Sequence, residues 1–334
     1  MEPKMTDIAK AAGVSIATVG RVIHNKGYVS PEARKRVEEA VEQLGYVPNT
    51  LARALITNRS GIIGCVMLEN GGNPHQEINK SLMMAAEKHG YRLFTMQSRV
   101  EVRDEEELIR QFIGLRVDGV VLLADMYFKE KHLELLHKRS IAVAAIERPY
   151  FLPYVDNICF KDEESAYFST HRMLEKGHRR IAFLGPKPEG NVEEERFAGF
   201  CRAMEEGGVP REEQILERTD SYRIDAGAAG MEHLLALSEP PTAVYCSADI
   251  LAAGAMQTLH KRGLHVPEDM SISAHDNYIA QMLAPPINSA EPCLETVGER
   301  TIELLLSRME NPELAPRVEE VGMRYIDRGT VLQK

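Results

Sequence analysis

Apolar positions near the start of the chain recur at helical spacing. Ile8, Ala9 and Ala12 fall on one face of a predicted first helix. We expect Thr6 to cap the beginning of this helix, and Gly13 to end it with the positive φ that glycine adopts easily. The segment from residue 6 to residue 13 is therefore predicted to be a short helix followed by a tight turn.

A second helix is predicted to follow at once. Ser15 is its expected cap, Val19, Val22 and Ile23 form its inward stripe, and Val14 fills the space between the two helices. Two helices joined by a turn of this length are typical of a helix-turn-helix. The outward face carries short side chains and one guanidinium, which suit thymine methyls, phosphates and a bidentate guanine contact: Ile16, Ala17, Thr18, Arg21 and Asn25.

A third helix is predicted from the Ser30-Pro31 pair to Gly45, because serine caps helices and proline is favoured at the first helical position. Its expected inward positions are Val37, Ala40, Val41 and Leu44. Residues 48–58 could then form a further helix, too short to be stable alone. We interpret that segment as a conditional hinge.

From Gly61 onward, apolar runs alternate with amphipathic segments, which predicts buried parallel strands separated by helices. The first series comprises 62–68, 91–96, 117–124 and 141–146. The second comprises 181–185, 215–218, 243–247 and 270–275. Two doubly wound α/β lobes follow from this pattern, and ligands of such sheets bind at the carboxyl ends of the strands, here a cleft between the lobes.

These motifs together resemble the lactose-repressor (LacI/GalR) family of bacterial transcriptional regulators, and the resemblance continues almost to the C-terminus. It rests on a Thr6-x-x-Ala-x-x-Ala-Gly-Val-Ser15 start, a Thr18-Val-x-Arg-Val22 core and a Pro48-Asn-x-x-Ala-Arg-x-Leu55 hinge. The resemblance implies that residues 15–21 enter the major groove. It also implies that a hinge helix containing Asn49, Ala52 and Leu55 folds on the operator, where Leu55 wedges into the minor groove and kinks the duplex.

The family organisation implies an all-α helix-turn-helix headpiece at 1–48, a hinge at 49–60 and an effector-binding and dimerisation core at 61–334. That core is expected to be periplasmic-binding-protein-like, with two doubly wound parallel-sheet lobes. Lobe 1 would hold about 61–160 plus 291–320, and lobe 2 about 161–290 plus 321–334. The segment 294–309 resembles the helix by which the chain returns to lobe 1, so three crossings are expected.

One departure from the family lies in the recognition helix. Gly20 stands where most members carry serine, and glycine inside a helix costs about 1 kcal/mol relative to alanine. The change removes an expected phosphate contact. Ile16 and Ala17 occupy the family's specificity positions, but they do not reveal a base sequence.

Charge divides the chain. Its formal net charge is −10, yet residues 1–60 hold nine Lys or Arg against six Asp or Glu. A basic head on an acidic body favours local phosphate binding that weakens with salt. The five cysteines are scattered without a Cys-x-x-Cys pair. The chain has neither a long apolar stretch near its N-terminus, as a signal peptide has, nor one long enough to span a membrane. We therefore expect reduced thiols and cytoplasmic residence.

Catalytic and cofactor motifs are missing. The sequence contains no Gly-x-Ser-x-Gly elbow, no phosphate loop ending in Gly-Lys-Ser/Thr and no His-Glu-x-x-His. Its histidines are spread singly, without metal-ligand spacing. We predict no enzymatic activity, no cofactor and no metal.

In lobe 1, the resemblance points to His75, Gln76 and Glu147 as effector contacts. His75 and Gln76 stand where the family has apolar or aromatic residues, so this wall would be more polar and would suit a hydroxyl-rich ligand. Alternatively, Asn73-Pro74 only begins a helix and these two side chains are solvated. Glu147 would accept sugar hydroxyls or pair with Arg148.

In lobe 2, the resemblance assigns Arg196, Tyr222, Asp249 and Asp276 to the effector site. Arg196 would bind a diol or carboxylate with its planar fork, or else form a surface pair with Glu193 or Glu194. Tyr222 would stack on a ligand ring or simply cap the core. Asp276 would accept adjacent hydroxyls or cap the next helix.

Two further departures bear on the cleft. Ala248 replaces the usual asparagine, and Lys161-Asp162 replace a common Asp-Asn pair. At least one family polar contact is therefore expected to be missing. A sugar, sugar acid or sugar phosphate suits the named side chains better than a purine.

The resulting hypothesis is a ligand-responsive, sequence-specific repressor of carbohydrate-utilisation genes. It would bind a palindromic operator as a dimer, with a tetramer left open, and it would not associate with membranes. Effector binding would alter hinge order and operator affinity. Inducer and corepressor remain open. A stand-alone sugar-binding protein explains only the lobes, and an α/β enzyme explains neither the headpiece nor the missing motifs.

Overall fold

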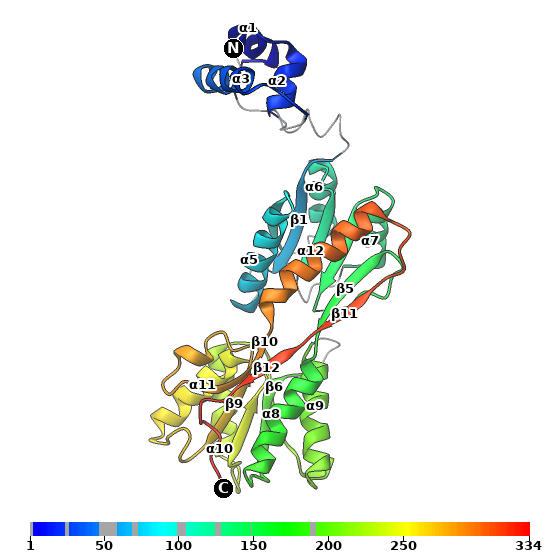
Figure 1. Ribbon diagram of the computed structural model, residues 1–334. Coiled ribbons are helices and arrows are strands. Elements are labelled where there is room, and N and C mark those ends of the chain that lie inside the picture. Colours follow the sequence, from blue (N-terminus) through cyan, green and yellow to red (C-terminus); the bar gives the residue numbers. More distant parts are fainter. Residues whose placement is uncertain are drawn as a thin grey trace. The chain divides into compact units, whose positions relative to one another are not determined.

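The computed structural model describes residues 3–23, 27–46, 59–68, 73–98, 105–123, 128–147, 149–187 and 192–334. It divides into two compact units, Met1–Ser60 and Gly61–Lys334. Each unit is described by itself (Figure 1). The predicted DNA contact Asn25, the hinge residues Asn49, Ala52 and Leu55, and Arg148 lie outside the described residues.

The first unit is a three-helix headpiece made of α1 (Met5–Ala12), α2 (Ile16–Ile23) and α3 (Pro31–Leu44). Its core centres on Ile8, Val19 and Val37, which are completely buried. Ser15 Oγ accepts a hydrogen bond of 3.1 Å from the amide of Thr18, and Ser30 caps α3 in the same way. The predicted caps of α2 and α3 are confirmed.

Two details of the headpiece correct the sequence prediction. Helix α1 begins at Met5, so Thr6 is not its cap but an exposed residue of the first turn. The reason is Asp7, whose carboxylate accepts a 2.8 Å hydrogen bond from the amide of Lys4 and so extends the helix backwards. Leu44 is 40% exposed rather than inward, because it is the last residue of α3 and the chain turns away at Gly45.

Lobe 1 of the second unit is a parallel six-stranded sheet in the order β11-β5-β4-β3-β1-β2. Helices α5 and α12 cover one face and α6 and α7 the other, and α12 lies beside α5 (Figure 1). The elements are β1 (Ile62–Leu68), α5 (Asn73–Lys88), β2 (Arg92–Ser98), α6 (Glu105–Leu115), β3 (Gly119–Leu123), α7 (Glu130–His137), β4 (Ala142–Ile146), β5 (Val155–Phe160), α12 (Leu294–Glu310) and β11 (Val318–Val321).

Lobe 2 repeats the plan with the order β12-β10-β9-β8-β6-β7, in which only the pairing of β10 with β12 is antiparallel. Helices α8 and α9 pack on one face, and α10 and α11 on the other. The elements are α8 (Asp162–Glu175), β6 (Ile181–Pro186), α9 (Val192–Glu206), β7 (Ile215–Thr219), α10 (Ile224–Leu235), β8 (Ala243–Cys246), α11 (Asp249–Lys261), β9 (Ser271–His275), β10 (Asn288–Pro292) and β12 (Met323–Ile326).

The chain passes between the lobes three times: from β5 to α8, from β10 to α12, and from β11 to β12. All eight strands predicted from apolar runs are present, and the predicted fold class is confirmed. Strands β5, β10, β11 and β12 escaped prediction. They are short and carry polar residues such as Asn157 and Glu319, so they do not read as apolar runs.

Helices α8 and α9 approach each other unusually closely, and this contact positions the candidate site in lobe 2. A side chain at Gly199 would collide with the backbone of Glu163, so only glycine permits the approach. The close contact brings Arg196, on α9, next to Asp162, the first residue of α8.

Candidate functional site

The exposed face of α2 is the candidate DNA-binding surface. Ser15, Ile16, Ala17 and Arg21 are exposed, and Ile16 retains 51% of its surface although it is large and apolar. Thr18 is half-buried and its hydroxyl lies 2.9 Å from that of Ser15. The helix thus presents hydroxyl, methyl and guanidinium groups away from its core, which is the chemistry of groove recognition.

In lobe 2, Arg196 is held between two carboxylates. Its Nε donates a 2.7 Å hydrogen bond to Asp162 Oδ1, and its Nη1 donates one of 2.7 Å to the carbonyl of Ser247. Its Nη2 lies 3.2 Å from Asp276 Oδ1. Ser247 and Asp276 directly follow the adjacent strands β8 and β9, so Arg196 and Asp276, two of the predicted site residues, meet at the carboxyl edge of the sheet. Arg196 is therefore buried rather than paired with Glu193 or Glu194 on the surface. Asp276 contacts Arg196 and does not act as a helix cap.

The Arg196 site is strongly ionised. Burial alone would lower the pKa of Arg196, but Asp162 and Asp276 hold it well above its usual value. Burial alone would raise the pKa of Asp162, but the charge of Arg196 and the nearby His275 hold it well below its usual range. A permanent cation and a permanent anion therefore lie in contact inside lobe 2.

Behind Asp162 lies His275, which is completely buried. Its Nε2 is 3.0 Å from Asp162 Oδ1, and its Nδ1 is 3.2 Å from the hydroxyl of Tyr245. Burial and then the charge of Arg196 lower the pKa of His275, so the ring is neutral at pH 7. The two ring nitrogens of this neutral histidine thus face Asp162 and Tyr245, one each.

Tyr222 donates a 2.5 Å hydrogen bond to Oε2 of Glu193, a buried carboxyl on α9. Burial raises the pKa of both groups. Gly185 leaves room for this arrangement, because a side chain there would collide with Glu193 and Ser247. Tyr222 is thus oriented by a hydrogen bond while 38% of its surface remains exposed.

Asp249 is almost fully buried, and its oxygens are engaged by protein groups. It accepts hydrogen bonds from the amides of Ile279 and Ala280 and from the hydroxyl of Ser289. Burial, and then the charge of Asp276, raise its pKa to about 7. The contacts favour a role in positioning the loop after Asp276 over direct contact with a ligand.

In lobe 1, two of the predicted residues meet. His75 Nε2 lies 2.9 Å from Glu147 Oε2, and both side chains are largely buried. Helix α5 does begin at Asn73, as the alternative interpretation held, but His75 is not solvated; Gln76 is exposed. The pair lies at the carboxyl ends of β1 and β4, as expected for a ligand site in such a sheet.

Backbone strain coincides with two of these positions. The backbone angle φ is +75° at Glu147 and +91° at Asp276, values that residues other than glycine rarely adopt. Strained residues persist only where the surrounding structure enforces them, and they cluster at functional sites. The strain supports a functional assignment for both carboxylates.

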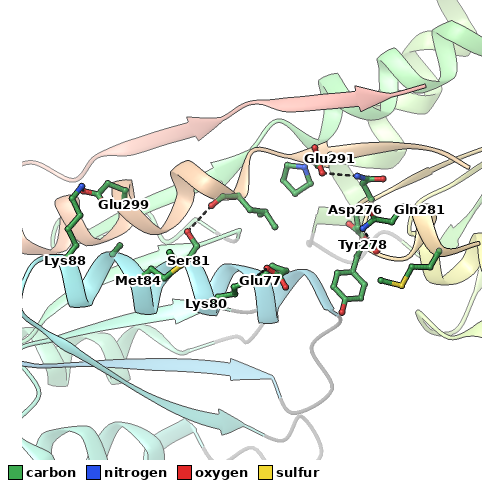
Figure 2. Close-up of a pocket in the computed structure, with 15 residues that line it drawn as sticks. Glu77, Lys80, Ser81, Met84, Lys88, Asp276, Tyr278, Gln281, Glu291 and Glu299 are labelled. Atoms are coloured by element: carbon green, nitrogen blue, oxygen red, sulfur yellow. Dashed lines mark hydrogen bonds and ion pairs between the residues drawn. The ribbon is translucent and has the colours of Figure 1, made fainter. Parts of the chain in front are cut away.

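A cavity of about 820 Å³ is lined by both lobes. Figure 2 shows side chains of α5, such as Lys80 and Met84, on one side and those of the segment 276–282, such as Tyr278, on the other. Asp276 therefore borders this cavity as well as contacting Arg196.

The parts of the chain that the structure describes contain no cluster of three His, Cys, Asp or Glu arranged for a metal ion. Within the same ranges, no helix has the length and apolar character needed to cross a lipid bilayer. All five cysteines are free thiols.

Three residues of the lobe 2 site escaped sequence reasoning as ligand-site residues: Asp162, Glu193 and His275. The only signal for Asp162 was that it departs from the family pattern, and the structure shows that it supplies a polar contact there. Glu193 was considered only as a surface partner of Arg196. A lone histidine such as His275 carries no spacing signal, so only the fold reveals its neighbours.

Comparison with known proteins decides the family. The family model of bacterial regulatory proteins of the lacI family matches residues 4–49, and a periplasmic binding protein-like domain matches residues 170–331. The HTH-type transcriptional repressor PurR of Actinobacillus pleuropneumoniae serotype 3 (strain JL03) is 31% identical over 310 residues, covering 91% of this chain and 90% of that protein. The chain belongs to the lacI family.

Other known regulators are similar to this chain over nearly its whole length. The regulator RegA of Clostridium saccharobutylicum is 30% identical, covering 94% of this chain and 95% of its own. The lac repressor dimer bound to operator and the anti-inducer ONPF has a TM-score of 0.85 at 20% identity, covering 99% and 100% of the two chains, which shows the fold. The regulator CelR in complex with cellobiose has a TM-score of 0.72 at 26% identity, covering 98% and 99%.

Membership of the lacI family makes this chain a DNA-binding transcriptional repressor with a domain for a small-molecule effector. The relatives are regulators and not enzymes, so the prediction of a non-catalytic protein is confirmed.

Proposed function

We propose that this repressor is a cytoplasmic homodimer that binds a palindromic operator and responds to a sugar or sugar derivative in the cleft between its lobes. Its headpiece would occupy 1–48, its hinge 49–60 and its effector core 61–334. Contacts with DNA come from Ser15, Ile16, Ala17, Thr18 and Arg21, with Thr6 at the start of α1. Asn25, Asn49, Ala52 and Leu55 complete the interface.

The contact of Arg196 with Asp276 carries the proposal of a sugar. The guanidinium has five N–H donors, and Asp162, Ser247 and Asp276 do not engage all of them. Asp276, whose side chain is partly exposed, retains lone pairs beside them. Donors and acceptors placed side by side match adjacent hydroxyl groups, each of which both donates and accepts.

The other predicted ligand residues, beginning with those of lobe 1, fit the same ligand class. His75 and Glu147 offer a further donor and acceptor, and exposed Gln76 follows His75 in sequence. Tyr222, held by Glu193, offers a ring face for an apolar side of a sugar. Asp249 shapes the loop that carries Asp276.

A purine base is the second candidate effector. Several relatives at 27–31% identity are repressors named PurR, and the partly exposed ring of Tyr222 is suited to stacking on a flat base. The polar and charged groups that surround Arg196 favour hydroxyls over a base, so we place the sugar first.

The cavity lined by both lobes supports a dimer whose geometry responds to the effector. Met84 on α5 is 62% exposed and Met282 is 69% exposed, and both line it. Met83 on α5 and Phe94 on the edge strand β2 are further large apolar side chains of lobe 1 that are exposed. Large exposed apolar side chains are typical of interaction surfaces. A second copy seated there would touch both lobes, so closure of the cleft would shift one protomer against the other.

A coupling free energy of about 1–3 kcal/mol between effector and operator would change operator affinity about 5–150-fold. That range suffices for a switch. Repression is the default output, and the direction of the response separates an inducer from a corepressor.

An electrophoretic mobility shift with genomic fragments and competitor DNA tests the DNA-binding assignment. The full chain should select specific fragments, and Arg21→Ala should weaken specific binding by about 5–150-fold, the worth of one guanine contact. Lys35→Ala, which removes an exposed positive charge from α3, is the matched control and should change binding far less. Equal effects of the two variants would contradict the assignment of α2.

Thermal denaturation with sugars, sugar acids, sugar phosphates and purines tests the effector class, because a ligand of the native state raises the melting temperature. A sugar should stabilise the wild-type chain and alter operator binding, and Arg196→Ala should abolish both effects. Stabilisation by a purine and by no sugar would replace the first candidate with the second.

A further inference from the structure

We infer that Asp162 is the residue that selects the charge of the effector: it neutralises Arg196, so that the site accepts uncharged polyhydroxy ligands and rejects anionic ones. This inference rests on the proposed sugar site and narrows it to neutral sugars. Sugar acids and sugar phosphates are thereby excluded, although Arg196 viewed alone would attract them.

The first step is the pairing of Arg196. An arginine open to a cleft binds carboxylate or phosphate through its planar fork. Here both edges of the fork are already partly occupied, because Nε donates to Asp162 and Nη1 donates to the carbonyl of Ser247. Nη2, which the two edges share, lies 3.2 Å from Asp276 Oδ1. An anion would have to displace a carboxylate that is already in contact.

The second step is the charge balance. Arg196 contributes one positive charge, whereas Asp162 and Asp276 contribute one negative charge each, and the neutral ring of His275 adds none. The cluster of these four residues is therefore net negative. Glu147 adds a further carboxylate on the lobe 1 side, next to His75. A ligand phosphate would enter a field of its own sign.

The third step is that Asp162 cannot move aside. Its side chain is only 2% exposed, and His275 lies behind it at 3.0 Å. Its pKa stays well below the usual range because of Arg196 and His275, despite burial. Asp276, by contrast, is 20% exposed and is free to meet a ligand. Asp162 therefore sets the charge permanently, and Asp276 makes the contact.

The carboxylate of Asp276 also acts on a neighbouring acidic group, Asp249. After burial, the charge of Asp276 is the next cause that raises the pKa of Asp249 to about 7. Asp276 therefore acts on Asp249 as a like charge, as it would act on an anionic ligand beside it.

Isothermal titration calorimetry on the full-length protein tests the inference with inorganic phosphate and with the pair D-ribose and D-ribose 5-phosphate. Wild type should bind neither phosphate nor the sugar phosphate at millimolar concentration. Asp162→Asn keeps the shape of the side chain and removes its charge, so it should bind phosphate at least about tenfold more tightly than wild type. Circular dichroism establishes that the variant is folded.

Two further variants sharpen the comparison. Glu268→Gln removes an exposed charge before β9, at the opposite end of that strand from Asp276, and should leave phosphate binding unchanged. Asp276→Asn removes the more accessible carboxylate and tests the charge balance of the cluster even if Asp162→Asn does not fold. It should also gain phosphate binding, because the net charge of the cluster changes equally.

Tight phosphate binding by wild type, or folded Asp162→Asn and Asp276→Asn variants that bind phosphate no better than wild type, would overturn the inference. A gain for Asp276→Asn alone, with Asp162→Asn folded, would also overturn it, because the selecting residue would then be Asp276. Failure of the proposed sugar site is a separate result. In that case no neutral sugar would stabilise wild type, while the phosphate measurements would still decide the role of Asp162.

Discussion

The Nε2 atom of His75 lies 2.9 Å from Oε2 of Glu147, although 71 residues separate them in the chain. His75 lies in the first turn of α5, and Glu147 directly follows β4 with a φ of +75°. Burial of both side chains keeps the pair largely out of water. A backbone strained at the residue that forms this contact suggests that the contact serves binding rather than stability.

Replacing Glu147 should separate stability from binding. Glu147→Gly removes the strain of a positive φ, whereas Glu147→Ala keeps it, so the glycine variant should be more stable than the alanine variant by about 1 kcal/mol. Both variants should lose at least about tenfold in affinity for the stabilising sugar. Thermal denaturation and calorimetry measure the two effects. Unchanged sugar affinity in both variants would remove Glu147 from the site.

A buried ion pair joins α12 to the sheet of lobe 1. Arg308 donates two hydrogen bonds of 2.8 Å to Asp156, and Arg317 donates three more, of 2.8, 3.0 and 3.1 Å. Asp156→Ala should lower the free energy of unfolding by about 3–5 kcal/mol, because it leaves Arg308 buried without its partner. Glu303→Ala breaks the exposed pair with Arg300 and should cost less than about 1 kcal/mol. Urea denaturation compares the two variants; equal losses would contradict this account.

The same carboxylate predicts a dependence on pH. Despite burial, hydrogen bonds from Arg308 and Arg317 lower the pKa of Asp156 in the folded state. A group with a lowered folded pKa stabilises the protein above its unfolded pKa, about 3.9 for aspartate, and loses that contribution as pH falls. The difference in melting temperature between wild type and Asp156→Asn should therefore shrink from about pH 7 to about pH 3. A difference that grows on acidification would contradict the sign.

Gly20 offers a stabilising substitution in the recognition helix. A side-chain carbon at Gly20 would lie 3.5 Å from the terminal methyl of Met5, an ordinary contact distance. Gly20→Ala should therefore stabilise α2 by about 1 kcal/mol, the difference in helix propensity. Amide hydrogen exchange of headpiece residues in the full-length protein should slow about fivefold. Faster exchange would show that the helix needs glycine for another reason.

The apolar surface around the cavity predicts the behaviour of the dimer. Met84→Glu and Met282→Glu place charges on that surface and should weaken self-association, which sedimentation velocity measures. Leu237→Glu alters an apolar side chain of lobe 2 that is also exposed but lies outside the cavity, and should leave the sedimentation coefficient unchanged. If the two methionine variants sediment as wild type does, the dimer forms through another face.

Local signals in the sequence sufficed for much of the fold. The caps Ser15 and Ser30 and the turn glycine Gly13 act within a few residues, so their effect can be read directly. The strands that the sequence did not predict, such as β11, are short and polar. They form because a neighbouring strand pairs with them. The start of α1 was misplaced because the hydrogen bond from the amide of Lys4 to Asp7 carries the helix back to Met5, ahead of Thr6.

The sequence by itself determined the family, the helix-turn-helix headpiece, the two α/β lobes and several candidate ligand residues, because those properties follow from local periodicity and motif. Only the tertiary structure decided what Arg196 faces. Its neighbours Asp162 and His275 come from α8 and β9, and the close packing of α8 on α9 brings the arginine and Asp162 together. Electrostatic interactions depend on distance in space, which a sequence read along the chain does not contain.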